Sequence, residues 1–543
     1  MVVPTSTYSL SHAVSTFDPA FRQLDLGRET TTSTSTSTSA SISTGSSIDQ
    51  GKRSDYDHDI DILIYGATSF TGKLVVKYLL QHPQYASGTG EFRFALGGRT
   101  KSKLDSLAEQ IELEAEEHQK PEVVCFPLCF PASSSEGSEG EEIEEIEEGV
   151  RKAVGGCKVV VNLAGPFSTQ NAEVLIRQCA QQGKHYVDLT GETPWVKEMI
   201  EKYDFLACST GSCIVPCCGF DSIPSDLTAY LSAQYLARHA HGSQESAQAD
   251  SVQRDAKLVS SETFHWIRGG VSGGTVGSAF VVAEMEKRRL QRGMGEFALT
   301  FRESGRPSKG FRPAYYNALS GLRGMFFVMA PVNSAIVRRS WSILQRAPLI
   351  LSAAPSSSAA SSSKSSWASS APVPARYGKD FTYDESMCLG PRGKGMSALS
   401  SCFFGLLLTA FGAAFASSSL VRSLVKLVAP VSGSGPSEEQ QKKGYFEAVN
   451  VAQSEKDAVV TTMFGRYDPG YSGTARMLAE SALSLSIAHD QISSIGKLGG
   501  VLTPSTAMGD ILAERLRRYG GFEISTSTFE DWKRAREADK KNV

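Results

Sequence analysis

The sequence lacks the patterns that mark several classes of protein. Its ten cysteines are scattered through apolar stretches with no CxxC pair, so neither a disulfide framework nor a zinc site is expected. The nine histidines include no HExxH motif, and we predict no metal site. The net charge is −3 and no Lys/Arg cluster alternates with aromatic residues, so no nucleic-acid partner is expected. No basic region followed by an apolar run opens the chain, which favours an intracellular protein with reduced thiols.

Length and composition predict two folded domains with tails and insertions. The 543 residues exceed a single domain of ordinary size, and 41% of them are hydrophobic. The Ser/Thr-rich run Thr30–Ser47 cannot bury a core, so residues 1–57 are expected to form a disordered tail. Two insertions are also predicted, a solvated acidic one at about residues 132–150 and a flexible Ser/Ala-rich one at 352–375.

Strands and helices alternate between these segments. Apolar stretches typical of strands occur at residues 59–66, 91–99, 157–165, 184–191 and 211–220. Helical spacing occurs at residues 71–82, 100–118, 170–183 and 223–236. This alternation predicts a parallel sheet with right-handed crossovers, buried on both faces.

A glycine turn, GATSFTG, lies between the first predicted strand and the first predicted helix. Gly66 permits a sharp turn out of the strand, and Gly72 lets the helix approach the sheet, so a pyrophosphate can bind the first-turn amides. Ser69 and Thr71 add hydroxyl donors. We predict that a dinucleotide phosphate binds here, with a plain tight turn as the alternative; the residues are Gly66, Ala67, Thr68, Ser69, Phe70, Thr71 and Gly72.

The residues at the end of the second predicted strand indicate which dinucleotide binds. Enzymes that use NAD usually have Asp or Glu there for the ribose hydroxyls. Here Arg99 and Thr100 follow the strand, and a guanidinium can bind a 2′-phosphate through two hydrogen bonds. NADP is therefore the predicted cofactor, unless Arg99 is an ordinary surface charge. The end of the third strand is expected beside the ribose and nicotinamide, through Asn162, Ala164, Gly165 and Pro166.

Several stretches together resemble those of the saccharopine dehydrogenase-like oxidoreductases. They are GATSFTGKLVVKYL, ALGGRTKSKLDSLA, VVNLAGPFSTQNAEVLIRQCAQQGKHYVDLTGETPW, CGFDSIPSDL and SGGTVGSA. The later stretches FGRYDPGYSGTARMLAESALSL and GGVLTPSTAMGDILAERL fit the branch that contains the mycobacterial trans-acting enoyl reductases and their eukaryotic relatives. The resemblance covers about residues 58–525.

The resemblance implies an α/β fold in several parts. These are an N-terminal Rossmann-type, doubly wound parallel sheet at 58–228, a second α/β (α+β) substrate domain at 229–470, C-terminal helices at 471–525 that pack back, and a charged tail at 526–543. It also implies NADPH-dependent reduction of a C=C or C=N bond. For eukaryotic relatives it implies a lipid-type substrate in glycolipid synthesis and association with lipid droplets, mitochondria or other membranes, with a cytoplasmic location as the alternative. No arginine set suited to the carboxylates of saccharopine is evident.

Polar residues at two strand ends are candidates for the chemistry. Hydride transfer needs a docked nicotinamide, a substrate held against it and often a proton donor. The stretches HYVDLTGE and CGFDSIPSD follow predicted strands, at the sheet edge where α/β proteins place their sites. We predict Asp188, Asp221 and Ser222 as catalytic residues, each with a hydrogen-bonded structural role as the alternative.

A serine hydrolase is an alternative from another reaction class. Residues 270–274 match the G-x-S-x-G pattern between a predicted strand and a predicted helix. His489 is the only histidine after Ser272, and it lies in an alanine-rich helical stretch unsuited to a catalytic base. We expect instead that these glycines let the backbone pass close to the cleft.

Residues 395–421 contain no charged residue. This segment predicts a buried helix, a helix that lies on a membrane surface, or a membrane span. Basic residues on both sides suit anionic headgroups: Arg392, Lys394, Arg422 and Lys426. A non-catalytic NADP-binding protein at a lipid droplet or membrane surface is therefore a further alternative. The expected partners are a small-molecule or lipid substrate, a peripheral membrane contact and, as an open alternative, a second copy in a homodimer.

Overall fold

The computed structural model describes most of the chain after residue 59. The described residues are 60–86, 91–114, 121–128, 139–241, 257–270, 273–285, 287–301, 305–310, 312–353, 376–390, 392, 394–430 and 434–541. Residues 55–543 group into one compact unit, separate from residues 1–54. The tail predicted at residues 1–57 lies outside the described ranges, as does the Ser/Ala-rich insertion from residue 354 to 375.

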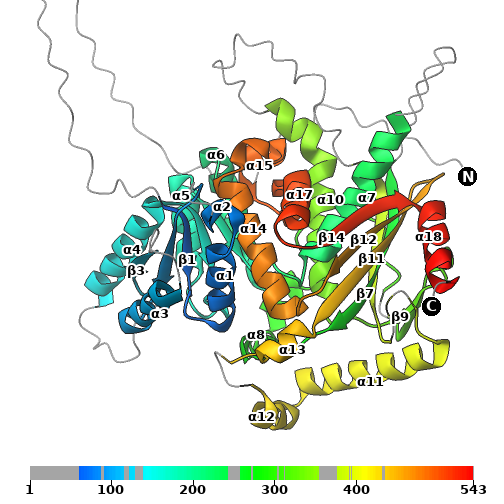
Figure 1. The fold of residues 1–543 in the computed structure, drawn as a ribbon, viewed down its shortest axis with the longest axis horizontal. Helices are drawn as coiled ribbons and strands as arrows, with labels where there is room; N and C mark the ends of the chain where they lie inside the picture. Colours follow the sequence, from blue (N-terminus) through cyan, green and yellow to red (C-terminus); the bar gives the residue numbers. More distant parts are fainter. Residues whose placement is uncertain are drawn as a thin grey trace, which may run out of the picture. The chain divides into compact units, whose positions relative to one another are not determined.

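Seven strands form a first, fully parallel sheet in the order β3-β2-β1-β4-β5-β6-β13 (Figure 1). Every residue of β1 and β2 is buried, as the continuous apolar runs predicted. The chain leaves β1 to one side and returns to β4 on the other, so the edge beyond β1 and β4 is the switch point where such sheets bind ligands. The strands are β1 (Ile60–Tyr65), β2 (Phe94–Gly98), β3 (Glu122–Cys125), β4 (Cys157–Asn162), β5 (His185–Asp188), β6 (Cys213–Val215) and β13 (Gly500–Val501).

Helices cover both faces of this sheet. Ile62 and Ile64 of β1 face one hydrophobic cluster, and Leu63 and Tyr65 face the other. The first cluster includes α1 (Phe70–Leu80), α3 (Lys101–Glu114) and α14 (Thr474–Ser486); the second includes α4 (Glu139–Gly155), α5 (Glu173–Gln182) and α6 (Thr193–Thr210). The predicted doubly wound parallel sheet is confirmed.

A second sheet has the order β14-β12-β11-β7-β10-β9-β8 and is antiparallel except for the pair β7 and β10. Helices α7 (Ile223–His241) and α10 (Ala330–Ala353) pack on it, which confirms the expected second domain. Because α7 spans residue 228, the boundary predicted there falls inside a helix. The strands are β7 (Leu258–Arg268), β8 (Ala314–Tyr316), β9 (Arg323–Met325), β10 (Tyr377–Cys388), β11 (Tyr445–Gln453), β12 (Ala458–Gly465) and β14 (Glu523–Thr528).

The C-terminal segments return to the first sheet. The short strand β13 pairs with β6, with Gly500 opposite Cys213, and α14 lies against β1, β4 and β5. Around them lie α15 (Ser494–Leu498), α16 (Pro504–Ala507) and α17 (Gly509–Arg518). The packing back of the C-terminal helices is therefore confirmed. Short helical segments elsewhere are α2 (Pro83–Ala86), α9 (Lys287–Gly293), α13 (Glu438–Lys442), η4 (Pro469–Gly473) and η5 (His489–Gln491).

The acidic insertion and the charged tail both include helical residues. The second part of the acidic insertion lies in α4, where Val150 and Val154 are fully buried. The predicted charged tail begins within β14 and continues as α18 (Phe529–Lys541), which buries Phe529 against the second sheet. Residues 144–149 of the acidic insertion are exposed or half-buried, and burial begins at Val150, where the apolar stripe of α4 turns inward.

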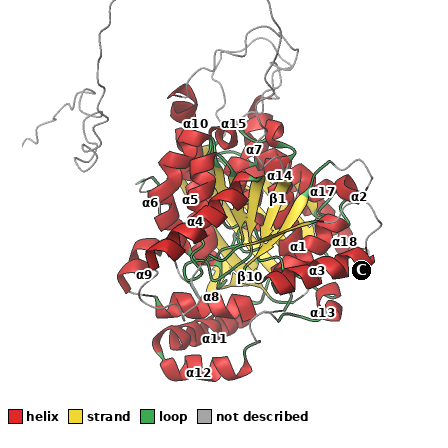
Figure 2. Ribbon diagram, turned by 90° about the vertical axis from the view of Figure 1, so that its left-hand side faces the viewer, coloured by secondary structure: helices red, strands yellow, loops and turns green. Residues whose placement is uncertain are grey.

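The uncharged segment forms α11 (Ala398–Ser417), which is followed by α12 (Ser419–Val428) (Figures 1 and 2). Within α11 the buried residues are Ser401 and Gly405, and none of the ten residues of α12 is buried. The alternative of a buried helix is therefore wrong. By length and composition only, α11 is long and apolar enough to cross a membrane.

Candidate active site

The glycine turn after β1 has close backbone contacts that only glycine permits. Gly66 has φ +88°, and a Cβ atom there would lie 2.9 Å from the carbonyl carbon of Leu163. A Cβ atom on Gly72 would lie 2.7 Å from the carbonyl oxygen of Ala67. Both distances are shorter than a real Cβ contact, so the two glycines let α1 begin directly against the strand end.

The first turn of α1 offers backbone donors at this edge. The Ser69 Oγ accepts a hydrogen bond from the Gly72 N–H at 3.0 Å and caps the helix. The other first-turn amides have no acceptor within a helix and carry partial positive charge. Ala67 is buried, whereas Thr68, Ser69, Phe70 and Thr71 are half-buried. This cradle fits a dinucleotide diphosphate.

Arg99 lies at the same sheet edge as the glycine turn. It follows the last residue of β2, which pairs in parallel with β1, and its side chain is exposed. The carbonyl of Thr100 accepts the Leu104 N–H at 3.2 Å and so begins α3. An exposed guanidinium beside a helix start can bind an anionic phosphate, which fits the predicted 2′-phosphate.

The loop after β4 is held from below by buried polar groups. The Asn162 Nδ2 donates to the Tyr186 hydroxyl at 3.0 Å, and its Oδ1 accepts the Ala164 N–H at 3.0 Å. Asn162 therefore shapes this loop from inside the protein. Ala164, Gly165 and Pro166 form the half-buried to exposed surface of the loop.

Glu192 is a buried carboxylate that fixes the next part of the same loop. Its two oxygens accept the N–H groups of Phe167 at 2.8 Å and Ser168 at 3.1 Å. We did not predict this role. The sequence pattern that could have indicated it is TGETPW, in which a glutamate stands immediately before a helix. A carboxylate at such a position often accepts hydrogen bonds from backbone N–H groups.

Asp188 joins the ends of two strands rather than facing outward. It is fully buried; its Oδ1 accepts the N–H groups of Thr190 at 2.9 Å and Cys217 at 3.1 Å, and its Oδ2 accepts the Tyr186 hydroxyl at 2.9 Å. Burial raises the pKa of Asp188 to about 7, although these hydrogen bonds lower it. The structure therefore places Asp188 under the site, where it positions the loops after β5 and β6.

Asp221 and Ser222 lie in the loop between β6 and α7. The Phe220 N–H donates to the Thr474 Oγ1 at 3.0 Å, which fixes this loop to α14. Asp221 is half-buried, and burial raises the pKa of its carboxyl to about 6. Ser222 is fully buried, and its Oγ donates to the Asn333 Oδ1 at 3.2 Å. Of the three predicted catalytic residues, Asp221 alone keeps an exposed part.

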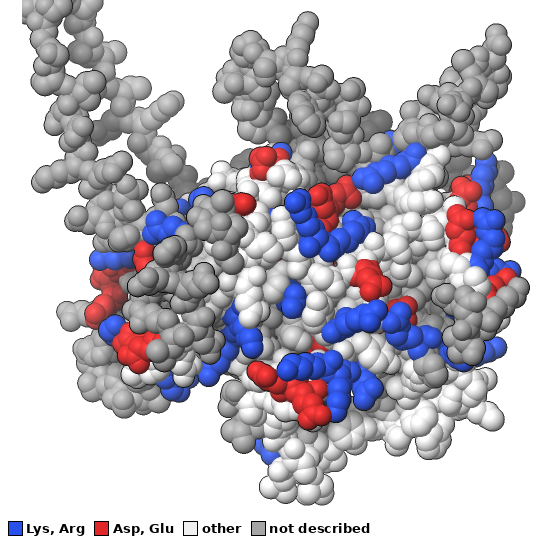
Figure 3. Space-filling view, viewed as in Figure 1, with Lys and Arg blue, Asp and Glu red and all other residues white. Residues whose placement is uncertain are grey.

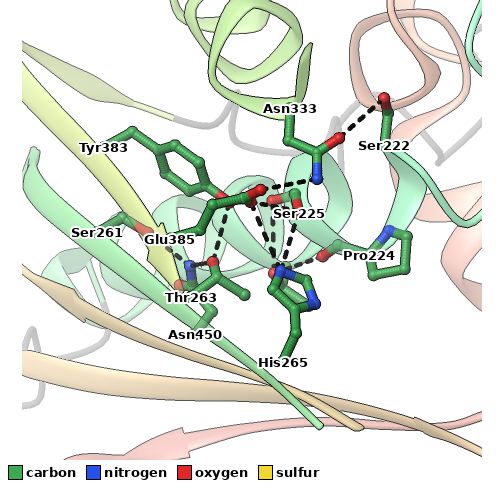
Figure 4. A network of polar contacts seen from close by, with 11 residues as sticks. Ser222, Pro224, Ser225, Ser261, Thr263, His265, Asn333, Tyr383, Glu385 and Asn450 are labelled. Atoms are coloured by element: carbon green, nitrogen blue, oxygen red, sulfur yellow. Dashed lines mark hydrogen bonds and ion pairs between the residues drawn. The ribbon is translucent and has the colours of Figure 1, made fainter. Parts of the chain in front are cut away.

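A buried polar network attaches Ser222 to the second sheet (Figure 4). The Asn333 Nδ2 donates to the Glu385 Oε1 at 2.8 Å. The Glu385 Oε2 accepts the hydroxyls of Ser225 at 2.8 Å and Tyr383 at 2.7 Å. His265 lies 3.5 Å from the same oxygen. The start of α7 is therefore held on α10, β10 and β7 together. Sequence reasoning did not find these residues, because no local pattern connects positions so far apart in the chain.

Two glycines after β7 pass close to the C-terminal segment. A Cβ atom on Gly269 would lie 2.8 Å from the Pro469 Cδ, and the Gly270 N–H donates to the Asp468 Oδ2 at 2.7 Å. Ser272 lies outside the described residues. The His489 ring stacks on His185 at a centroid distance of 4.8 Å, at the start of β5 and thus at the opposite sheet edge from Asp188. Within the described part of the chain, His489, the one histidine that follows Ser272 in the sequence, therefore lies away from the ligand edge.

Comparisons with known proteins agree with this arrangement. Residues 62–215 match the model of the saccharopine dehydrogenase NADP-binding domain. A Mycobacterium tuberculosis protein assigned by name to the trans-acting enoyl reductases is 30% identical over 487 residues, which cover 85% of this chain and 96% of that protein. The chain is a saccharopine dehydrogenase-like oxidoreductase. A trans-acting enoyl reductase of Mycobacterium bovis is 29% identical to it over 475 residues, which cover 86% of this chain and 97% of the relative.

Among solved structures, this saccharopine dehydrogenase-like protein is similar to the L-Glu-forming saccharopine dehydrogenase of Saccharomyces cerevisiae. The TM-score is 0.41 at 10% sequence identity, over 86% of this chain and 99% of that one. The cofactor of this saccharopine dehydrogenase-like oxidoreductase is NADP, because the matched family domain binds NADP and the glycine cradle and Arg99 fit it.

Replacing Arg99 should affect the binding of NADPH much more than the binding of NADH. We expect Arg99→Ala to weaken NADPH binding about 10–100-fold, since it removes hydrogen bonds to a charged phosphate, and to leave NADH binding nearly unchanged. Titration calorimetry with both cofactors measures this difference. Arg93→Ala is a matched control, because Arg93 lies before β2 and its guanidinium bonds Glu122 at 3.2 Å. Equal losses for NADPH and NADH in Arg99→Ala would contradict the 2′-phosphate role.

Proposed function

We propose that this oxidoreductase reduces a carbon–carbon double bond of an acyl substrate with NADPH. The observation that carries the proposal is the similarity to relatives named trans-acting enoyl reductases, which extends over 85–86% of the chain at 29–30% identity. Similarity of that extent includes the second sheet and the C-terminal helices as well as the cofactor domain. A lipid-type acyl group is the substrate class that this reading favours.

The buried arginines of α10 support a substrate without several carboxylates. Arg338 binds Glu296 at 2.8 Å and the carbonyl of Arg306 at 3.0 Å. Arg339 donates to the carbonyls of Leu299 at 2.9 Å and Val501 at 3.0 Å. Both guanidinium groups hold segments of the protein together, so neither is offered to a substrate with several carboxylates such as saccharopine.

The residues around the switch point can serve a reduction in distinct ways. Bound NADPH supplies the hydride. Asn162 and Glu192 keep the loop of Gly165 and Pro166 in place, and Asp188 holds the loop that carries Asp221. The carboxyl of Asp221 is protonated below about pH 6 and can then donate its proton to the substrate, which together with the hydride adds two hydrogens across the double bond.

The pH dependence of the reaction should show the loss of the proton from the Asp221 carboxyl. Because burial raises the pKa of Asp221 to about 6, the donor form is lost as the pH rises through about 6, and we expect kcat/KM to fall above that value. Asp221→Asn should remove this limb of the profile and lower kcat about 100-fold. Asp226→Asn makes the same change at a buried carboxylate that accepts the Ser505 N–H at 2.9 Å, and should keep the limb. A limb that persists in Asp221→Asn would rule out this donor.

The proposed function is tested by supplying purified protein with NADPH and three substrate classes: α,β-unsaturated acyl thioesters, imines and ketones. We expect NADPH oxidation with the unsaturated thioesters, and a product heavier by two hydrogens in mass spectrometry. NADPH oxidation with imines alone would show that the protein reduces C=N bonds instead. Tight NADPH binding without reduction of any class would overturn the proposal.

A further inference from the structure

The outer face of α11 carries a continuous apolar stripe. Phe403, Leu407 and Phe411 are spaced four residues apart and are more than half exposed. Leu399, Phe404 and Leu406 extend the same exposed surface. No Asp, Glu, Lys or Arg occurs anywhere in α11. A monomeric soluble protein rarely leaves so much contiguous apolar surface in water.

The next helix is amphipathic, but its apolar face points outward. Leu420, Leu424, Leu427 and Val428 are all more than half exposed. Its basic side chains reach back toward α8 (Gly273–Glu284) instead: Arg422 and Lys426 each lie 3.9 Å from a Glu284 oxygen, and the Lys426 Nζ lies 4.8 Å from the Phe280 ring centroid. These two cations therefore lie on the side of α12 that faces α8, away from its apolar face.

Contacts along its whole length hold α11 flat against the protein. Near its start, the Met396 N–H donates to the Arg323 carbonyl at 2.8 Å. In its middle, a Cβ atom on Gly405 would lie 2.8 Å from the Pro313 carbonyl carbon, and near its end Phe415 packs on Phe280 at a centroid distance of 5.1 Å. A membrane span by α11 would have to break the contacts of Gly405 and Phe415. The outer stripe instead lies parallel to the protein surface, where one plane can cover it and α12.

We propose that the outer faces of α11 and α12, here called the apolar platform, dock this oxidoreductase flat on a phospholipid membrane. A protein partner needs polar groups at the interface to set its register, and the outer face of α11 has no charged group to provide them. A lipid surface does not have to be aligned with the protein residue by residue. It takes up apolar side chains at the boundary between the headgroups and the acyl chains. In Figure 3 the lower edge of the molecule, where Figure 1 places α11 and α12, is largely white.

Helix α8 connects the apolar platform to the cofactor site. Figures 1 and 2 both show α8 beside α11, and Phe280 of α8 contacts both Phe415 and Lys426. At the other end of the connection, a Cβ atom on Gly277 of α8 would lie 3.9 Å from the Pro166 Cγ. Docking therefore brings the loop of Pro166 close to the lipid, and we infer that the acyl substrate enters from the membrane along α8. This second step rests on the proposed function.

The docking step is tested with the full-length protein and phosphatidylcholine vesicles in a flotation assay. Phe403 and Leu427 are 64% and 81% exposed on the platform, and Phe205 and Leu349 are 87% and 73% exposed on α6 and α10. We expect Phe403→Ser/Leu427→Ser to lower the vesicle partition constant at least about 10-fold, because each side chain loses its transfer into an apolar phase. The matched variant Phe205→Ser/Leu349→Ser should bind like the wild type. NADPH binding confirms that both variants are folded.

Three results would overturn the docking step. The wild-type protein could stay in solution, the two variants could lose binding equally, or Phe403→Ser/Leu427→Ser could convert a dimer into a monomer in light scattering, which would make the platform an interface between two copies. Binding should also persist at high salt and without anionic lipid, because the contact is apolar. A requirement for anionic lipid would assign the binding to charge instead.

Delivery is tested by presenting one unsaturated acyl group in two forms, a long-chain form in vesicles and a short-chain form in water. We expect Phe403→Ser/Leu427→Ser to lower kcat/KM at least about 10-fold for the vesicle form and to leave the soluble form unchanged. Equal losses for both forms would overturn delivery from the membrane while docking stands. Reduction of neither form by the wild type would overturn the proposed function and leave the vesicle binding result intact.

Discussion

Gly66→Ala should abolish NADPH binding, with a loss of affinity of more than about 100-fold. The new methyl group would lie 2.9 Å from the Leu163 carbonyl carbon, and the residue would keep φ +88°, a region that side chains rarely adopt. The turn must move to relieve both, and the first-turn amides of α1 then leave the positions that hold the diphosphate. Fluorescence titration with NADPH measures the loss.

Gly98→Ala is the matched control for this prediction. A Cβ atom there would lie 3.5 Å from the Leu104 Cδ2, an ordinary contact, and Gly98 has no positive φ. It should change NADPH affinity by less than about 3-fold, since the added methyl group makes only an ordinary contact and forces no change of the backbone. If Gly66→Ala binds NADPH as well as Gly98→Ala does, the turn is not the diphosphate site.

Asp188→Ala should lower the free energy of unfolding by about 4 kcal/mol. The change leaves the buried N–H groups of Thr190 and Cys217 without their acceptor, the Asp188 Oδ1. Each unsatisfied buried donor costs roughly 1–3 kcal/mol, and the lost volume adds to this. Denaturant unfolding followed by circular dichroism measures the change. A loss below about 1 kcal/mol would show that water replaces the carboxylate, and the positioning role would be wrong.

Asp188→Asn separates the hydrogen bonds from the charge. Its side-chain oxygen can still accept the two N–H groups, so we expect a loss of only about 1 kcal/mol at neutral pH. Burial raises the pKa of Asp188 to about 7 from an ordinary 3.8, so the folded state binds this proton more tightly than the unfolded state. The stability that it contributes is full below pH 4 and decreases as the pH rises through about 7. The difference between wild type and Asp188→Asn should follow this curve.

The first sheet could be predicted from the sequence because its strands are long apolar runs between helical stretches. The glycine turn and Arg99 could be placed for the same reason, since both follow directly from the end of a predicted strand. The orientation of Asp188 could not be predicted, because a carboxylate at a strand end has the same sequence pattern whether it faces a ligand or the interior. Asp188 faces the interior because it accepts the Cys217 N–H, and Cys217 belongs to the loop after another strand.

Other features depend on contacts that no local pattern reveals. The strand β13 has only two residues, too few to show any periodicity. The helix α11 has no charged residue to indicate which side faces water, so its sequence was compatible with a core helix. In α4, the run of glutamates gave no sign that one helix continues from the acidic insertion to the buried Val150 and Val154.

The pairing of β13 with β6 has a consequence for synthesis on the ribosome. The cofactor half is encoded first, yet the edge of its sheet at Cys213–Val215 stays open until Gly500 and Val501 have left the exit tunnel. The face of the first sheet that α14 covers also stays uncovered until α14 has been synthesised. For that interval the nascent chain exposes an unpaired strand edge and apolar side chains, the features that lead to aggregation. We therefore expect a chain truncated before β13 to need chaperones and not to fold as a small, self-sufficient NADP-binding module.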